Sequence, residues 1–77
     1  MKTRYIRYTL QGEHSAADAQ TALGEPGTQG LVVRVDTGAG ETQIYLATER
    51  TLAAMSAKLS RGIKAKEVSA SEVTKIF

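Results

Sequence analysis

The side chains that most often carry out catalysis are few in this sequence and stand apart from one another. His14 is the only histidine, cysteine is absent, and the serines lie at expected helix caps or on helical faces. General acid–base catalysis needs paired titratable groups in one pocket, and metal binding needs several ligands grouped together. We therefore expect no catalytic residue, no metal and no cofactor, and the alternative that the sequence leaves open is an active site formed between two subunits. The sequence favours a protein that works by binding.

One short motif does correspond to a known chemistry. Asp36-Thr37-Gly38-Ala39 resembles the signature of retroviral-type aspartic proteases, in which two subunits each contribute an aspartate that activates water. The resemblance implies a nearly all-β protein with a second apolar-Gly-Arg element near its C-terminus, and this sequence has no counterpart of that element. Asp and Gly are also the residues that a hairpin turn requires. We interpret the motif as a turn.

Length and charge restrict the function further. The 77 residues suffice for one domain, and a net charge of +2 is far below that of a dedicated DNA-binding protein. No apolar run approaches the roughly 20 residues that span a bilayer, and the N-terminus lacks the apolar segment of a signal peptide. We expect a cytoplasmic protein that gains stability as a homodimer.

The elements that would position binding residues alternate between strands and helices. Alternating apolar and polar residues predict strands over 4–10, 30–36, 41–48 and 63–68, with a tight turn at 36–40. Helical spacing predicts a first helix between Ser15 and Gly24. A second helix is expected to begin at Thr48 or Thr51 and to end at Gly62.

This order predicts an α+β fold, a ferredoxin-like βαββαβ sandwich with a four-stranded antiparallel sheet and two helices on one face. We expect a single domain over residues 1–68 and a C-terminal tail over 69–77, which forms a short helix or an extra strand. Ser69 and Glu72 fit a capping box and favour the helix. The expected core side chains are Ile6, Leu10, Leu23, Leu31, Val33, Val35, Ile44, Leu46, Leu52, Met55, Leu59 and Val68.

The uncovered face of that sheet is the strongest functional prediction. Its strands would expose two tyrosines, two arginines and a glutamine. The apolar end of the chain either closes the core or the far side of the sheet, or extends the binding surface. The candidate set is Tyr5, Arg7, Arg34, Gln43, Tyr45, Ile76 and Phe77. We expect this surface to bind a protein, either a second copy of the chain or another partner.

The alternative is single-stranded nucleic acid, bound by Tyr5 and Tyr45 with Arg7 and Arg34. In layout the chain resembles RNA-recognition domains, which stack bases on aromatic residues of the first and third strands. The aromatic consensus of the third strand is absent, because residues 41–46 read Glu-Thr-Gln-Ile-Tyr-Leu.

Overall fold

A computed structural model describes residues 2–57, 59 and 62–74 of the chain. The elements, in order, are β1 (Arg4–Gln11), α1 (Ala16–Leu23), the 3₁₀ helix η1 (Glu25–Thr28), β2 (Leu31–Gly38), β3 (Glu41–Thr48), α2 (Leu52–Ser56), β4 (Lys64–Val68) and α3 (Ala70–Thr74). The strands form one antiparallel sheet in the order β2-β3-β1-β4. The predicted α+β class with a four-stranded antiparallel sheet is confirmed.

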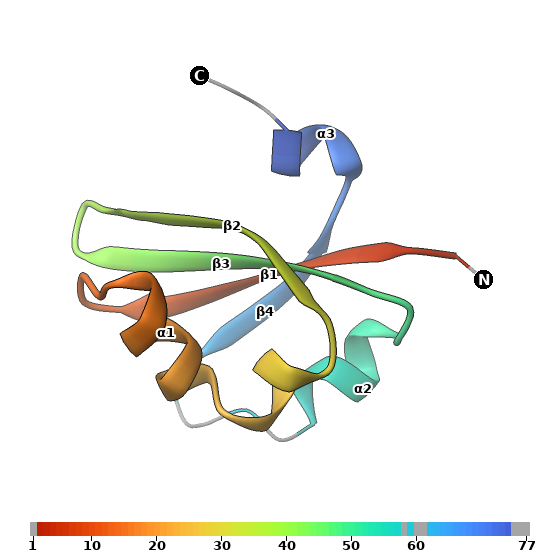
Figure 1. The fold of residues 1–77 in the computed structure, drawn as a ribbon, viewed down its shortest axis with the longest axis horizontal. Helices are drawn as coiled ribbons and strands as arrows, with labels where there is room; N and C mark the ends of the chain where they lie inside the picture. The colour runs from red at the N-terminus through yellow and green to blue at the C-terminus, as the bar shows by residue number, and fades with distance from the viewer. Residues whose placement is uncertain (1, 58, 60–61, 75–77) are drawn as a thin grey trace.

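The helices lie on both sides of this sheet. Figure 1 shows α1, η1 and α2 below the strands and α3 above them. We call the side that α1 and α2 cover the inner face, and the side that α3 approaches the outer face. The sequence predicts a bare outer face, and this expectation is wrong because α3 packs against β1 there. Within residues 2–57, 59 and 62–74, no helix has the length and apolar character needed to cross a membrane.

Helices α1 and α2 both begin where a side chain caps them. Ser15 accepts a hydrogen bond from the Asp18 amide at 3.2 Å, and the positive φ of Gly24 (74°) ends α1, as predicted. Thr51, one of the two predicted caps, opens α2. That helix is shorter than predicted because it ends at Ser56, and Leu59 packs against the core from the segment that follows.

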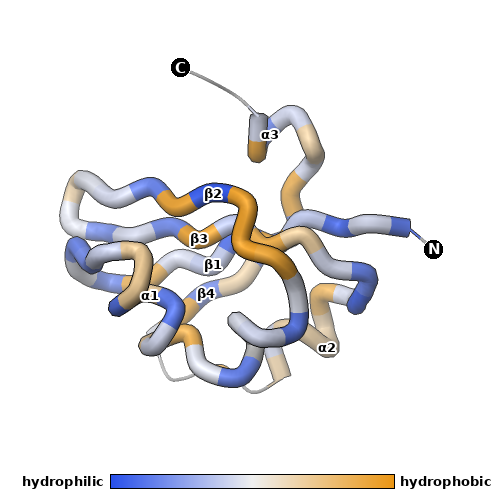
Figure 2. Tube along the Cα trace, viewed as in Figure 1, coloured by the Kyte–Doolittle hydropathy of each residue, from blue (hydrophilic) through white to orange (hydrophobic). Residues whose placement is uncertain are grey.

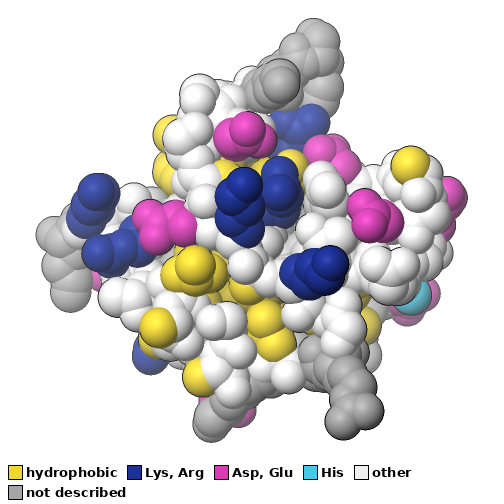
Figure 3. Space-filling model, turned by 180° about the vertical axis from the view of Figure 1, so that it is seen from behind, with side chains coloured by type: hydrophobic (Ala, Val, Ile, Leu, Met, Phe, Trp, Pro, Cys, Tyr) yellow, Lys and Arg dark blue, Asp and Glu magenta, His cyan; other side chains and the backbone are white. Residues whose placement is uncertain are grey.

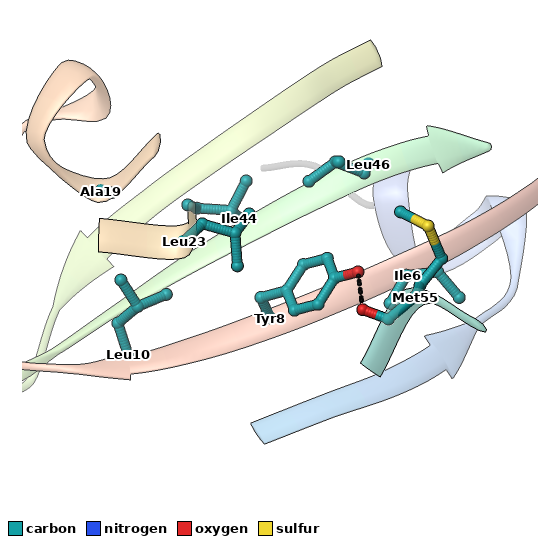
Figure 4. Packing of buried hydrophobic residues seen from close by; sticks show 8 residues of the cluster. All are labelled: Ile6, Tyr8, Leu10, Ala19, Leu23, Ile44, Leu46 and Met55. Carbon is teal, nitrogen blue, oxygen red and sulfur yellow. Dashed lines mark hydrogen bonds between the residues drawn. The ribbon is translucent and has the colours of Figure 1, made fainter. Parts of the chain in front are cut away.

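The core fills the space between the inner face and the two helices. Alternate residues of β1 and β3 point into it, and helices α1 and α2 close it from the other side (Figure 4). Its buried members are Ile6, Tyr8, Leu10, Ala19, Leu23, Ile44, Leu46 and Met55. The Tyr8 hydroxyl donates a hydrogen bond of 2.9 Å to the Met55 carbonyl, which ties β1 to α2.

A β-bulge changes which residues of β2 face the core. Val32 pairs with Leu46 and Arg34 with Tyr45, so Val33 between them has no partner on β3. The extra residue reverses the alternation at that point, which turns Val32 inward and Leu31 outward. The prediction that Leu31 and Val33 are core residues is therefore wrong: they are 69% and 41% exposed.

Val68, also predicted in the core, lies on the outer face instead. It pairs with Tyr5 of β1, whose neighbour Ile6 points inward. Because facing residues of paired strands point to the same side of a sheet, Val68 lies on the outer face with Tyr5.

The connection between β1 and α1 is fixed to the β2–β3 hairpin by hydrogen bonds. The Thr42 hydroxyl accepts from the His14 amide at 2.8 Å and donates to the Gly12 carbonyl at 2.9 Å. His14 also accepts a bond from the Thr37 hydroxyl at its carbonyl, and Glu13 accepts one from the Gly40 amide. These hydrogen bonds hold the β1–α1 connection against the end of the β2–β3 hairpin.

The buried hydroxyl of Tyr8 makes stability depend on alkaline pH. Burial raises the pKa of this phenol to about 12 from 10.0. The neutral form is favoured in the folded protein, so its stabilisation is complete below pH 10 and is lost as pH rises through about 12. Tyr8→Phe should cost about 1–2 kcal/mol at pH 7, because the Met55 carbonyl loses its donor.

The measurement is urea unfolding of both proteins between pH 7 and pH 12. The wild type should lose roughly 2 kcal/mol more than Tyr8→Phe over the alkaline part of the range. Tyr5→Phe, on the outer face, is the control and should follow the wild type. Parallel curves for wild type and Tyr8→Phe would contradict the buried hydrogen bond.

The hairpin turn contains a residue that is poorly suited to its backbone. Ala39 has φ 54° and Gly40 has φ 78°, and positive φ at both central residues is the requirement of a type I′ turn. An alanine held at positive φ costs roughly 1–2 kcal/mol, and asparagine tolerates this conformation better. Ala39→Asn should therefore raise the melting temperature by about 4–8 °C for each kcal/mol gained. Ala39→Val should lower it, and a rise for valine would contradict the turn geometry.

Candidate functional site: the outer face of the sheet

The outer face carries two rows of side chains that differ in chemistry. The pairing of the strands aligns Leu31, Ala47, Tyr5 and Val68 across the sheet in an apolar row. The same pairing aligns Arg34, Tyr45, Arg7 and Lys66 in a basic row. The apolar row and the basic row thus lie side by side, and each crosses all four strands.

Arg34 holds α3 against the β2 side of the basic row. Its Nε lies 2.9 Å from Asp36 Oδ2, and its Nη1 donates to the Val73 carbonyl at 3.0 Å. The guanidinium also lies 5.8 Å from the centre of the Tyr45 ring, within the range of a cation–π contact. One side chain therefore joins β2, β3 and α3.

Tyr45 is buried beneath this arrangement. Only 5% of the residue is exposed, and its hydroxyl donates to Gln43 Oε1 at 3.2 Å. Val73 of α3 is also buried. The expected exposure of Tyr45 is wrong, because the sequence pattern shows its face but not the helix that covers that face.

Arg7 is less completely paired than Arg34. Its Nη1 lies 3.9 Å from Glu72 Oε2, at the limit of an ion pair, and 26% of its side chain is exposed. Within the described part of the chain, its Nε is buried without a hydrogen-bond partner. Arg7 thus retains hydrogen-bonding capacity that α3 does not use.

The apolar row ends at an exposed edge. Leu31 stands on the edge strand β2, and Figure 2 shows the hydrophobic run with which this strand begins. Leu31 and Val33 are the large hydrophobic side chains that remain exposed among the described residues. This end of the outer face is the part best suited to contact another apolar surface.

The structure thus brings together five of the seven predicted site residues. Tyr5, Arg7, Arg34, Gln43 and Tyr45 all lie on the outer face, although their role in binding remains a prediction. Ile76 and Phe77 fall outside the described residues.

Two lysines of β4 belong to this surface and were not among the predicted site residues. Lys66 faces Arg7 and Lys64 faces Thr9, because Ala65 between them points to the core. Seen from behind, basic side chains gather near the middle of the molecule with acidic ones around them (Figure 3). The alternation of Lys64-Ala65-Lys66 could have indicated this, once β4 was paired with β1.

The residues with catalytic potential are engaged in structural contacts. Asp36, from the protease-like motif, is paired with Arg34, and the motif itself runs from β2 into the hairpin turn. His14 Nε2 lies 2.8 Å from the Gln11 carbonyl. Among the described residues, no three His, Asp or Glu side chains come together as possible metal ligands.

The chain matches no protein-family model, no curated protein and no solved structure at a significant level.

The contacts of Arg34 predict how firmly α3 is held. Arg34→Lys keeps one charge but replaces the planar fork, whose separate nitrogens reach Asp36 and Val73, by a single ammonium, so we expect a loss of about 1–2 kcal/mol in urea unfolding. Amide hydrogen exchange in α3 should become faster. Arg50→Lys, at an exposed position beyond β3, is the matched control and should change neither quantity. Equal effects of the two substitutions would show that Arg34 does not anchor the helix.

Proposed function

We propose that this protein is a small, non-catalytic interaction module that binds a second copy of itself through the outer face of its sheet. The exposed pair Leu31 and Val33 carries this proposal, because Leu31 stands at the solvent end of the apolar row and Val33 adds a second exposed apolar side chain on the same edge strand. Burying a leucine or valine side chain contributes about 1.5–3 kcal/mol. In a two-fold dimer each such contact occurs twice.

We also propose that the domain has the ferredoxin-like βαββαβ architecture. The strand order β2-β3-β1-β4 supports this assignment, as do α1 after β1 and α2 after β3 on one side of an antiparallel sheet. In this arrangement the outer face is the natural docking surface, since the inner face is filled by the core. A cytoplasmic location is part of the same proposal and can be tested by cell fractionation.

The two edges of the sheet differ in a way that favours β2 as the interface. The edge strand β4 is short and turns Lys64 and Lys66 outward, a pattern that discourages pairing with another sheet. The edge strand β2 is longer and exposes Leu31 and Val33. We therefore expect the second copy to contact the β2 side.

Leu31→Glu tests the dimer. Because Leu31 is 69% exposed, a glutamate there should leave the fold intact and oppose association by placing a charge in the contact. Light scattering should give a dimer mass for the wild type and half that mass for Leu31→Glu, with unchanged circular dichroism. Tyr45→Asp would test the fold rather than the dimer contact, since Tyr45 is only 5% exposed and the substitution would bury a carboxylate.

Ala22→Glu provides the matched control, because Ala22 is an exposed residue of α1 on the opposite side of the sheet. It adds the same charge and should leave the dimer mass unchanged. A wild type that is monomeric at high concentration, or a Leu31→Glu variant that keeps the wild-type mass, would exclude this interface.

A further inference from the structure

Three cations gather on the outer face of β1 and β4. Arg7 and Lys66 stand directly opposite each other, and Lys64 lies two residues from Lys66 on the same side of the sheet. Like charges that face each other across paired strands destabilise a sheet. Among the described residues, the acidic side chain that approaches Arg7 is Glu72 of α3, at 3.9 Å. We call Arg7, Lys64 and Lys66 the basic cluster.

Protection of the sheet edge explains only part of this cluster. Lysines on an edge strand discourage pairing with another sheet, which accounts for Lys64 and Lys66 on β4. Arg7 lies on the central strand β1, where no edge needs protection. Its position opposite Lys66 adds repulsion, and its buried Nε has no hydrogen-bond partner among the described residues. A ligand that carries negative charge would relieve both costs.

Aromatic rings flank the cluster on two strands. Tyr5 lies two residues from Arg7 on β1, on the same face and only partly buried. Tyr45 faces Arg7 from β3 and is buried, with the Arg34 guanidinium 5.8 Å from its ring centre, and Arg34 in turn bonds to the Val73 carbonyl of α3. Cations beside aromatic rings on an open sheet are the usual combination for single strands, since the cations meet phosphates and the rings stack on bases.

Few contacts hold α3 on the outer face. α3 comprises five residues and follows β4 after Ser69 alone. A helix of this length is unstable without tertiary contacts. Among the described residues its contacts with the outer face centre on buried Val73, the Arg34 bond to the Val73 carbonyl and the long Arg7–Glu72 pair. Glu72 offers Arg7 the kind of negative charge that a phosphate would supply.

We propose that the basic cluster binds the phosphates of a single-stranded nucleic acid, and that α3 is a displaceable cover that competes for this site. The strand replaces Glu72 as the partner of Arg7, and a base stacks on Tyr5. Displacement of α3 also releases Arg34 from the Val73 carbonyl, so that Arg34 can move off the Tyr45 ring and leave it as a second stacking surface. This proposal does not require the dimer, since the basic cluster lies on the β4 side of the sheet, away from Leu31.

The test is fluorescence anisotropy of a labelled oligouridylate with the 77-residue chain at several salt concentrations. Three phosphate contacts predict a slope of about −2 in log K against log salt. Arg7→Gln combined with Lys66→Gln should reduce affinity at least about tenfold and bring the slope near −0.7. Thermal unfolding checks that this variant folds, and its melting temperature should stay close to that of the wild type, because removal of the Arg7–Lys66 repulsion offsets the loss of the long Arg7–Glu72 pair.

Two variants test the site and the cover separately. Arg50→Gln combined with Lys2→Gln removes the same charge from exposed positions outside the cluster and should keep most of the affinity. Val73→Ser weakens the apolar anchor of α3 and should tighten binding about fivefold or more, whereas Ala70→Ser on the exposed side of α3 should not. Leu31→Glu should still bind, so failure of the dimer and failure of this site can be told apart.

Three results would overturn the proposal. The first is no binding by either the wild type or Val73→Ser, and the second is equal loss in the two double glutamine variants. The third is displacement of the oligouridylate by an equal concentration of polyglutamate, which would assign the cluster to an acidic protein partner. If Val73→Ser leaves the affinity unchanged, α3 does not compete with the oligouridylate for the basic cluster.

Discussion

The position of β1 in the middle of the sheet is the constraint on which most of this structure depends. Its inward residues Ile6, Tyr8 and Leu10 form the centre of the core, and its outward residues include Tyr5 and Arg7. Because successive side chains of a strand point to opposite faces, one register decides both sets at once. A shift of β1 by one residue would bury Arg7 and expose Tyr8. The hydrophobic core therefore also fixes the chemistry of the outer face.

Those parts of the fold that depend on local pattern could be predicted from the sequence. Strict alternation in β1 and β3 indicated which residues face the core, and Ser15 and Gly24 marked the ends of α1. The α+β class follows from the order of the elements. The bulge at Val33 could not be predicted, because Leu31, Val33 and Val35 fit a regular strand equally well. The pairing of β2 with Tyr45 and Leu46 of β3 determines where the bulge lies, and this long-range contact leaves no local sequence signal.

The position of α3 marks the limit of sequence reasoning about the candidate site. A capping pattern at Ser69 favoured a helix, but nothing in the pattern indicated which surface the helix would meet. Arg34 fixes α3 on the outer face, because it is held on β2 by its ion pair with Asp36 and donates a hydrogen bond to the Val73 carbonyl of the helix. Five of the seven predicted residues were therefore brought together on one face, while the accessibility of Tyr45 was misjudged. Lys64 and Lys66 joined them because β4 lies next to β1.

The two sides of the outer face differ in how well their charged side chains are paired. On the β2 side, Arg34 has strong partners, Tyr45 is buried and α3 adds a buried valine, so this part behaves as a small second core. On the β4 side, Arg7 faces Lys66 and lies 3.9 Å from Glu72. The repulsion between the two cations is therefore only weakly compensated there. Stability alone would favour an acidic or neutral residue at one of these positions. The separation places structural contacts on one side of Tyr45 and unsatisfied charge on the other, which is why the β4 side is the better candidate for an anionic ligand.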